Sequence, residues 1–232
     1  MAAQTVVIVA ARNEAERIGA TLAALAHAFP HAPLWVADDG SRDRTAEIAR
    51  AAGARVLSTG RPLGKGGALS AAAREALRHL REAAPEPGER TVVLLCDGDL
   101  GGSARVLTAL TDVVRAGEAD VAVAAFSRRV GGGLGITVGF ARAAIARRCG
   151  LRTRAPLSGQ RAISADALAQ LLPFASGFGM EVAMTIDAVR AGLRVSELEL
   201  DLSHRASGLE PAGFAHRARQ LADIVRAYLA RG

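Results

Sequence analysis

The 232-residue sequence has little of what would place it outside the cell or across a membrane. It has two cysteines, Cys96 and Cys149, whose spacing is not typical of a metal site or a disulfide framework. No apolar run reaches the roughly 18 residues that a spanning helix needs. The N-terminus lacks the basic segment of a signal peptide. We therefore expect a cytoplasmic protein with reduced thiols.

Aromatic residues and lysine are also scarce. Aromatic residues make up 3% of the chain, which is few for stacking on nucleic-acid bases, so we expect no nucleic-acid partner. Lys65 is the only lysine among 29 basic residues. The net charge of +6 favours acidic partners such as phosphates or an anionic membrane surface. A GC-rich genome would give the same arginine-rich composition.

Short β-branched runs alternate with helical patterns through the first half of the chain. The strand patterns cover 5–10, 33–38, 54–58, 91–96 and 119–126. The helical patterns between them cover 14–29, 43–53, 66–83 and 103–117. Repeated β-α-β units predict an α/β fold with a mostly parallel central sheet flanked by helices. In such sheets, ligands bind beyond the carboxyl ends of the strands.

The pattern changes after residue 126, within what we interpret as a single domain covering 1–232. The glycine-rich segment 127–139 is expected to be too flexible for a regular element. Helical patterns at 140–149, 164–172 and 178–191, a strand pattern at 193–202 and a basic amphipathic helix at 213–232 follow. The last helix is compatible with peripheral contact with a membrane surface and with a homodimer.

Three acidic clusters follow predicted strands: RNE at 12–14, DDGS at 38–41 and DGD at 97–99. Because parallel strands end at one edge of a sheet, we expect the clusters to converge on one cleft. Two carboxylates one residue apart, Asp97 and Asp99, can hold Mg²⁺ or Mn²⁺, and the ion can hold a diphosphate. A single D-x-D is more often a simple turn, but the convergence favours a site.

Lys65 lies between glycines at the start of a predicted helix, in 64-GKGGA-68. The glycines allow close backbone approach, the helix N-terminus favours anions, and the ammonium group is a compact charge. The spacing is not that of a Walker A loop. We interpret the segment as a phosphate contact; the alternative is a surface lysine in a turn.

The set ARNE, DDGS and DGD resembles the family 2 glycosyltransferases with the GT-A fold, over about residues 5 to 215. DDGS followed by DRTA, a helix and GARV is specific, whereas DGD departs from the commoner D-A-D. The resemblance implies metal-dependent, inverting transfer of a sugar from a nucleotide-diphosphate sugar, with UDP favoured over GDP. It divides the domain into a nucleotide-sugar-binding half, 1–126, and an acceptor half, 127–232.

The resemblance also implies roles for individual residues in the donor site. The nucleotide-sugar contacts would be Ala11, Arg12, Glu14, Asp39, Gly64, Lys65, Gly66, Asp97 and Gly98. Asp39 would lie near the base, and Asp99 would be the principal metal ligand, with Asp97 close to the ribose or the ion. His204 would be the last metal ligand, as in members related to glucosyl-3-phosphoglycerate synthases, although a lone histidine is more often structural.

The acceptor side is implied by two further segments. In 157-LSGQRAIS-164, Ser158, Gly159 and Arg161 would border the sugar and the acceptor, and Arg161 would contact a phosphate or sugar unless it is an exposed turn arginine. Arg205 echoes the lipid-phosphate arginine of polyprenyl-phosphate sugar synthases, but the R-x-x-G segment is incomplete. Glu181 would be the general base for a hydroxyl acceptor, or only a partner of its helix dipole.

Several alternatives stay open on the sequence. The acceptor would be a small phosphorylated acid such as 3-phosphoglycerate, a polyprenyl phosphate, or another hydroxyl compound. A sugar-phosphate nucleotidyltransferase would normally have glycines in the loop that here reads 10-AARNEAER-17. An NAD-binding enzyme would show G-x-G-x-x-G after the first strand, which is absent. A non-enzymatic basic module that binds nucleic acid or membrane is the last alternative.

Overall fold

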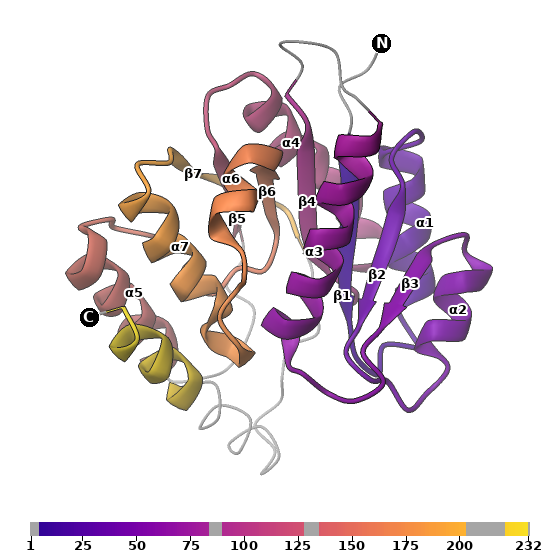
Figure 1. Ribbon diagram of the computed structural model, residues 1–232, viewed down its shortest axis with the longest axis horizontal. Helices are drawn as coiled ribbons and strands as arrows, with labels where there is room; N and C mark the ends of the chain where they lie inside the picture. The colour runs from indigo at the N-terminus through magenta and orange to yellow at the C-terminus, as the bar shows by residue number, and fades with distance from the viewer. Residues whose placement is uncertain (1–4, 84–89, 128–134, 203–220, 232) are drawn as a thin grey trace.

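A seven-stranded sheet with helices on both faces runs through the molecule (Figure 1). The computed structural model describes residues 5–83, 90–127, 135–202 and 221–231. The strands are β1 (Thr5–Ala11), β2 (Leu34–Asp38), β3 (Arg55–Ser58), β4 (Val92–Asp97), β5 (Val121–Phe126), β6 (Arg161–Ser164) and β7 (Val195–Leu200). Their order is β3-β2-β1-β4-β6-β5-β7, and β6 alone is antiparallel to its neighbours. The predicted α/β fold with a mostly parallel sheet is confirmed.

The strand predictions hold for every strand except β6. The five strands of the first half and β7 lie within a residue or two of the predicted ranges. No strand was predicted at the position of β6. Its four residues, RAIS, are too few to show an alternating pattern, and a fully buried arginine opens it.

The helices also follow the predicted order. They are α1 (Ile18–Ala28), α2 (Thr45–Ala51), α3 (Lys65–Glu82), α4 (Thr108–Arg115), α5 (Ile136–Cys149), α6 (Ala165–Leu171) and α7 (Met180–Arg190). Short 3₁₀ turns, η1 (Gly101–Leu107) and η2 (Gly177–Gly179), precede α4 and α7. The prediction of an irregular segment up to 139 is wrong for 136–139, because α5 begins directly after Gly135, whose φ of 68° suits glycine. The predicted C-terminal helix is described only at 221–229.

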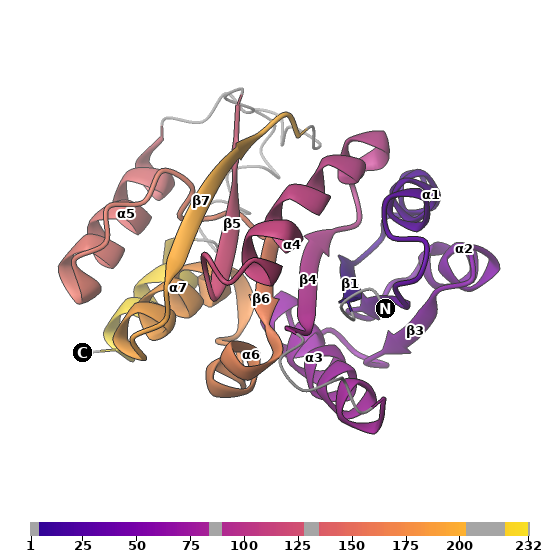
Figure 2. The ribbon, with the colours of Figure 1, turned by 90° about the horizontal axis from the view of Figure 1, so that it is seen from above.

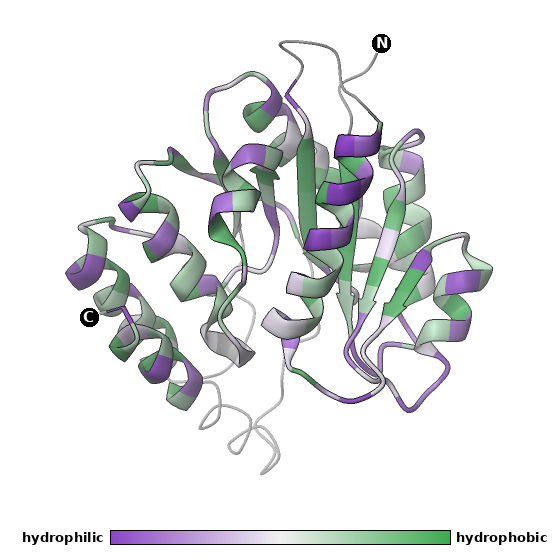
Figure 3. Ribbon diagram, in the orientation of Figure 1, coloured by the Kyte–Doolittle hydropathy of each residue, from purple (hydrophilic) through white to green (hydrophobic). Residues whose placement is uncertain are grey.

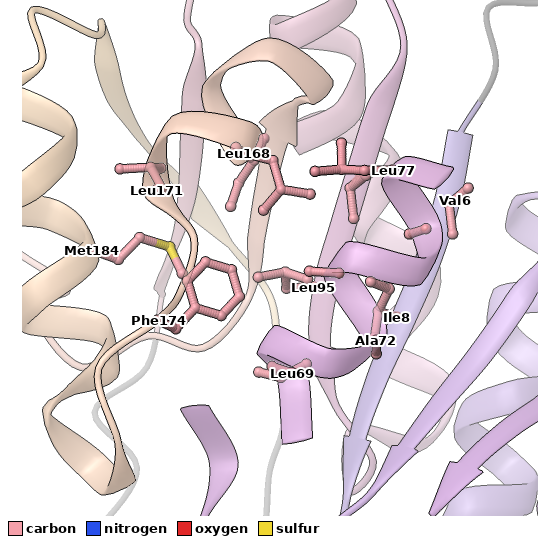
Figure 4. Close-up of a cluster of buried hydrophobic side chains, with 14 of the residues drawn as sticks. Val6, Ile8, Leu69, Ala72, Leu77, Leu95, Leu168, Leu171, Phe174 and Met184 are labelled. Carbon is pink, nitrogen blue, oxygen red and sulfur yellow. The ribbon is translucent and has the colours of Figure 1, made fainter. Parts of the chain in front are cut away.

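Two apolar layers hold the helices on the sheet. One face packs under α3, α6 and α7, where Leu69, Leu168, Phe174 and Met184 meet Leu95 (Figure 4). The other face packs under α1, η1 and α4, as the view from above shows (Figure 2). The central strands are almost uniformly apolar, whereas α2 and α3 also carry hydrophilic bands (Figure 3). Strands buried on both faces are typical of a parallel sheet between helix layers.

A third, smaller cluster joins α5, α7 and the described part of the C-terminal helix. Ile224 is fully buried between them, and Tyr228 lies beneath the guanidinium of Arg148, 4.0 Å from the ring centroid. Ile224 and Ala227 therefore pack within the chain, whereas Leu229 on the same helix is 65% exposed. In the part of the chain that the structure describes, no helix is both long and apolar enough to cross a membrane.

Candidate active site at the carboxyl edge of the sheet

Strands β1, β2 and β4 end side by side, at the lower edge of the sheet in Figure 1. The amide of Gly98 donates to the carbonyl of Ala10 at 2.9 Å, and the amide of Asp39 donates to the carbonyl of Ala11 at 3.0 Å. The turns after β2 and β4 are thus both attached to the end of β1. The predicted convergence of the three acidic clusters is what the structure shows.

β6 brings the second half of the chain to the same edge. Because β6 is antiparallel to β4, its first residue, Arg161, pairs with Leu95 near the end of β4. The residues before it, Ser158, Gly159 and Gln160, therefore lie beside Asp97. The strand that the sequence did not reveal is the one that places the predicted acceptor segment at the site.

Asp39 fixes the segment that precedes α3. Its carboxylate is 5% exposed and accepts hydrogen bonds from the amides of Leu63 at 2.6 Å and Gly64 at 3.1 Å. The guanidinium of Arg12 lies 3.8 Å from the same carboxylate and is about half exposed. In this structure Asp39 holds the backbone in front of Lys65, while its contact with a base stays a prediction.

The loop after β1 is held against the start of α2. Asn13 has a φ of 56°, its side-chain oxygen accepts from the amide of Arg42, and its own backbone amide donates to the hydroxyl of Ser41. The amide of Glu14 donates to the hydroxyl of Thr45 at 2.8 Å. These bonds fix the backbone that carries Arg12 and Glu14 at the cleft.

Glycines allow the start of α3 to pack closely against the segment before α7. Gly64 has a φ of 79°, which favours glycine. A Cβ on Gly66 would lie 1.8 Å from the carbonyl oxygen of Ala175, so no other residue fits there without a shift of the backbone. This close approach brings Lys65, at the first position of α3, within reach of α7.

Lys65 bridges two carboxylates from different parts of the chain. Its Nζ lies 2.6 Å from Oδ1 of Asp97 and 2.9 Å from Oε1 of Glu181. Nε2 of Gln160 donates to the other oxygen of Asp97 at 3.1 Å. We call these four residues, Lys65, Asp97, Gln160 and Glu181, the Lys65 cluster. Lys65 is therefore a central cation of the cleft and not a lysine in a surface turn.

The electrostatics of the cluster keep Lys65 charged. Burial alone would lower the pKa of Lys65, but the two carboxylates, Asp97 and Glu181, outweigh it and hold the pKa above its ordinary value. Gly159 permits this arrangement, since a Cβ there would lie 2.3 Å from Nζ of Lys65 and 2.9 Å from Oδ2 of Asp97. Gly159 therefore belongs to the site through its missing side chain.

Arg161 is fully buried behind the cluster. Its Nε donates to the carbonyl of Ser158 at 2.9 Å, and its Nη1 donates to the hydroxyl of Thr185 at 3.0 Å. Burial lowers the pKa of Arg161 to about 10, which still leaves it charged at neutral pH. The alternative of an exposed turn arginine is thus wrong, while the contact with a phosphate or sugar stays a prediction. Arg161 ties the segment before β6 to α7.

Three buried polar atoms in the segment before β6 have no hydrogen-bond partner among the described residues: Oγ of Ser158, Oε1 of Gln160 and Nη2 of Arg161. A buried polar atom without a partner costs about 1–3 kcal/mol. Their grouping beside the Lys65 cluster is best explained by a polar ligand or ordered water that satisfies them when the site is filled.

The DGD turn is rigidly held. The hydroxyl of Thr21 in α1 donates to the carbonyl of Gly98 and accepts from the amide of Gly101, both at 2.8 Å. A Cβ on Gly98 would lie 3.1 Å from the side chain of Ile18, which is tight enough to account for glycine where alanine is commoner. The turn therefore presents Asp97 and Asp99 in a fixed relation to the end of β4.

The two aspartates supply hard oxygen ligands of the kind that Mg²⁺ and Mn²⁺ prefer. Among the described residues, no group of three or more His, Cys, Asp or Glu side chains is placed to hold an ion. The predicted ligand His204 and the predicted acceptor contact Arg205 lie outside the described residues. The donor chemistry fits a divalent ion anchored by this turn that takes further ligands from elsewhere, such as a diphosphate.

Sequence reasoning missed Gln160 and Thr185, which hold Asp97 and Arg161 in place. Gln160 lies between two residues that were predicted, so the segment was identified but not this side chain. Thr185 lies one turn after Glu181 on α7, and its hydroxyl also contacts the carbonyl of Glu181 at 2.9 Å. No spacing in the sequence distinguishes it from an ordinary core threonine.

Comparisons with known proteins identify the family and the fold of the chain. Residues 6–143 match the profile of the family described as "Glycosyl transferase family 2". The fold matches crystal structures of glucosyl-3-phosphoglycerate synthase from Mycobacterium tuberculosis. One, in complex with Mn²⁺, UDP and glucosyl-3-phosphoglycerate, has a TM-score of 0.74 and 26% identity over 99% of this chain and 80% of the other. Among curated proteins, no sequence match is found.

Two further structures of the same synthase give the same result. The complex with Mn²⁺, UDP and phosphoglyceric acid has a TM-score of 0.75 and 26% identity, over 99% of this chain and 78% of the other. The complex with Mg²⁺ and UDP has a TM-score of 0.74 and 25% identity, over 99% and 79%. These matches confirm the GT-A fold that the motifs predicted. Since the profile also covers more than half of the sequence, the chain belongs to glycosyl transferase family 2 and is a glycosyltransferase.

Proposed function

We propose that this glycosyltransferase moves a hexose from a UDP-sugar to a small phosphorylated acceptor, with inversion and with a divalent ion. The single observation that carries the proposal is the Lys65 cluster beside the DGD turn, at the edge where a parallel sheet binds its ligands. The similar synthase from M. tuberculosis binds Mn²⁺ or Mg²⁺ with UDP, and phosphoglyceric acid. These ligands match the charges present here.

The donor would lie across the ends of β1, β2 and β4. Its nucleoside would contact Arg12, Glu14 and Asp39, and the backbone at Ala11 would lie alongside it. The start of α3, with Gly64, Lys65 and Gly66, faces the diphosphate, because amides of a helix N-terminus and an ammonium group both attract anions. Asp97 and Asp99, with Gly98 between them, would anchor the ion, with His204 as a further ligand.

A bound Mg²⁺ or Mn²⁺ would neutralise the charge that develops on the leaving diphosphate. Among the chain's own residues, Lys65 would help to neutralise that charge. It stays protonated and can move from Asp97 towards the phosphates. When Lys65 exchanges the carboxylate of Asp97 for a phosphate of the donor, it still has an anionic partner. Lys65 therefore both stabilises the empty cleft and binds the donor.

The acceptor would lie between the segment before β6 and the start of α7. Oγ of Ser158 and Oε1 of Gln160 have no hydrogen-bond partner among the described residues and would bind its polar groups, while Gly159 lets Lys65 and Asp97 pack against this segment. The acceptor oxygen forms a bond to the anomeric carbon on the side opposite the diphosphate, whose bond to that carbon breaks. Glu181 takes the proton from a hydroxyl acceptor, whereas an ionised phosphate acceptor needs no base.

Arg161 acts as a positioning residue in this proposal. It holds the carbonyl of Ser158 and the hydroxyl of Thr185, and so sets the distance between the acceptor segment and Glu181. Replacing it would raise KM for the acceptor and lower kcat together, because both walls of the acceptor site would shift.

The experiment that tests the proposal is a product assay with UDP-glucose, phosphoglyceric acid and Mn²⁺. The wild type and Glu118→Ala, which removes an exposed carboxylate just before the start of β5, should have the same turnover rate. Asp99→Ala should lose turnover while keeping the melting temperature of the wild type. Nuclear magnetic resonance of the product should show an anomeric configuration opposite to that of the donor. Full turnover in Asp99→Ala, or transfer from GDP-glucose alone, would contradict the assignment.

A further inference from the structure

A cavity lies at the edge of the sheet opposite the candidate active site, where β1 begins, and has a volume of about 300 Å³ (Figure 1 shows this edge at the top). Its wall combines the start of β1, the loop from α1 to β2, the end of α3 and both ends of α4. His79, on its wall, is 14 positions after Lys65 on α3, which is about 21 Å along a helix. The cavity is therefore separate from the candidate active site.

The polar part of the lining is basic. Three of the lining residues are His31, His79 and Arg115, two are Thr5 and Thr108, and none is Asp or Glu. Nη2 of Arg115 donates to the hydroxyl of Thr5 at 2.5 Å, and Nη1 donates to the exposed Asp112 at 3.1 Å. Nε of Arg115 is buried and has no hydrogen-bond partner among the described residues. The guanidinium of Arg115 therefore belongs to a lining that contains no carboxylate.

The rest of the lining is apolar. Val6, Phe29 and Leu80 are nearly or fully buried and form the inner surface, and prolines 30 and 33 complete the rim. A cavity at the small end of the range for ligand pockets, with an apolar floor and a few convergent donors, suits a small organic molecule. A bare inorganic ion would leave the apolar floor uncovered, and a purely apolar molecule would leave the arginine donor unpaired.

We propose that this cavity is a second ligand site, which binds a small organic anion through a phosphate or carboxylate group. The anion accepts from Arg115 and is flanked by His31 and His79, while its organic part covers Phe29 and Leu80. Nothing in this site is shared with the donor or acceptor contacts at the other edge.

The chain carries its own reporter for this site. Trp35 is the only tryptophan in the sequence, is 2% exposed, and lies with its ring centroid 5.8 Å from that of His79. A ligand that contacts His79 changes the surroundings of the indole ring of Trp35. Tryptophan fluorescence therefore reports on the cavity without a label.

The experiment is a fluorescence titration of the full chain with phenyl phosphate and with benzoate, and with benzyl alcohol as a neutral analogue. We expect a saturable change with one or both anions and weaker binding of the alcohol. Arg115→Gln should raise the dissociation constant about tenfold or more, because it removes a charge-assisted hydrogen bond. Arg81→Gln removes an exposed charge at the same end of α3 without touching the cavity, and should bind as the wild type does.

Two further variants keep the test decisive. His31→Gln changes an exposed lining residue and should weaken anion binding even if Arg115→Gln fails to fold. Asp99→Ala should leave the titration unchanged, so that failure at this site is distinguishable from failure of the proposed transferase reaction. Equal affinity in the wild type, Arg115→Gln and His31→Gln, equal affinity for benzyl alcohol, or no saturable change would each overturn the proposal.

Discussion

Replacing Lys65 by methionine should destabilise the protein more than any comparable surface change. The substitution keeps the length of the side chain but leaves Asp97 and Glu181 without their common cation. Breaking a buried ion pair by removing one partner costs about 3–5 kcal/mol. The side chain of Asp97 is 31% exposed and that of Glu181 7%, so we expect the lower end, about 3 kcal/mol. For a chain of this size that is a fall in Tm of about 6–12 °C.

The pH dependence of the stability lost in Lys65→Met follows from the direction in which the pKa of Lys65 is shifted. The pKa of Lys65 is raised above its ordinary value of 10.5. Its contribution to stability is therefore complete below that value and is lost only as the pH rises through the folded-state pKa. The difference between the wild type and Lys65→Met should thus be constant between about pH 6 and 9.

Thermal unfolding of four proteins tests this reasoning. Lys65→Arg keeps the charge and should lose less stability than Lys65→Met. The double variant Lys65→Met with Glu181→Gln has one carboxylate fewer and should be more stable than Lys65→Met alone, since the two effects share one interaction. If Lys65→Met unfolds at the temperature of the wild type, or if the double variant is less stable than the single one, Lys65 is not the shared partner of these carboxylates.

Two further predictions concern stability away from the ion pair. Gly66→Ala places a Cβ against the carbonyl of Ala175 and should lower the free energy of unfolding by at least about 1–3 kcal/mol. Gly139→Ala, in α5 with open space around it, should raise the free energy of unfolding by about 0.5–1 kcal/mol. Urea unfolding of both variants checks this, and equal effects would refute the close contact at Gly66. Hydrogen bonds from Arg194 lower the pKa of Asp120 to about 2, so its stabilisation is present above about pH 4 and is lost as the pH falls towards 2. Asp120→Asn should therefore cost about 1–2 kcal/mol at neutral pH, a gap that closes below pH 4 in urea titrations; a gap that stays constant on acidification would contradict the assignment.

The sequence was sufficient to predict that the three acidic clusters meet at one edge of the sheet. Carboxyl ends of parallel strands share an edge, so the clusters at 12–14, 38–41 and 97–99 could be brought together without coordinates. Lys65 was identifiable because it is the only lysine in an arginine-rich chain. Glu181 was identified by the resemblance to the family, and its place at the start of an apolar helix offered the alternative of a helix-dipole partner. These predictions depend on chain order and composition, which a sequence contains.

The contacts inside the site could not be predicted in the same way. The bridge from Lys65 to Asp97 and Glu181 depends on the insertion of β6 beside β4, and four residues carry no measurable alternation. Arg161 was predicted as a phosphate or sugar contact, with an exposed turn arginine as the alternative, and its full burial was not predicted, since arginine is almost never fully buried. Its burial is possible only because the carbonyl of Ser158 and the hydroxyl of Thr185 accept from it, and these partners are brought together by tertiary structure.

The most direct test of the central claim is the binding of UDP with and without Mn²⁺, measured by thermal shift on the wild type and on Asp99→Ala. A ligand that binds the folded state raises Tm by mass action. The account predicts a Mn²⁺-dependent shift with UDP in the wild type, a smaller one with GDP, and none in Asp99→Ala. A shift of equal size in Asp99→Ala, or no shift with any nucleoside diphosphate in the wild type, would contradict the claim that the DGD turn and the Lys65 cluster form a nucleotide-sugar site.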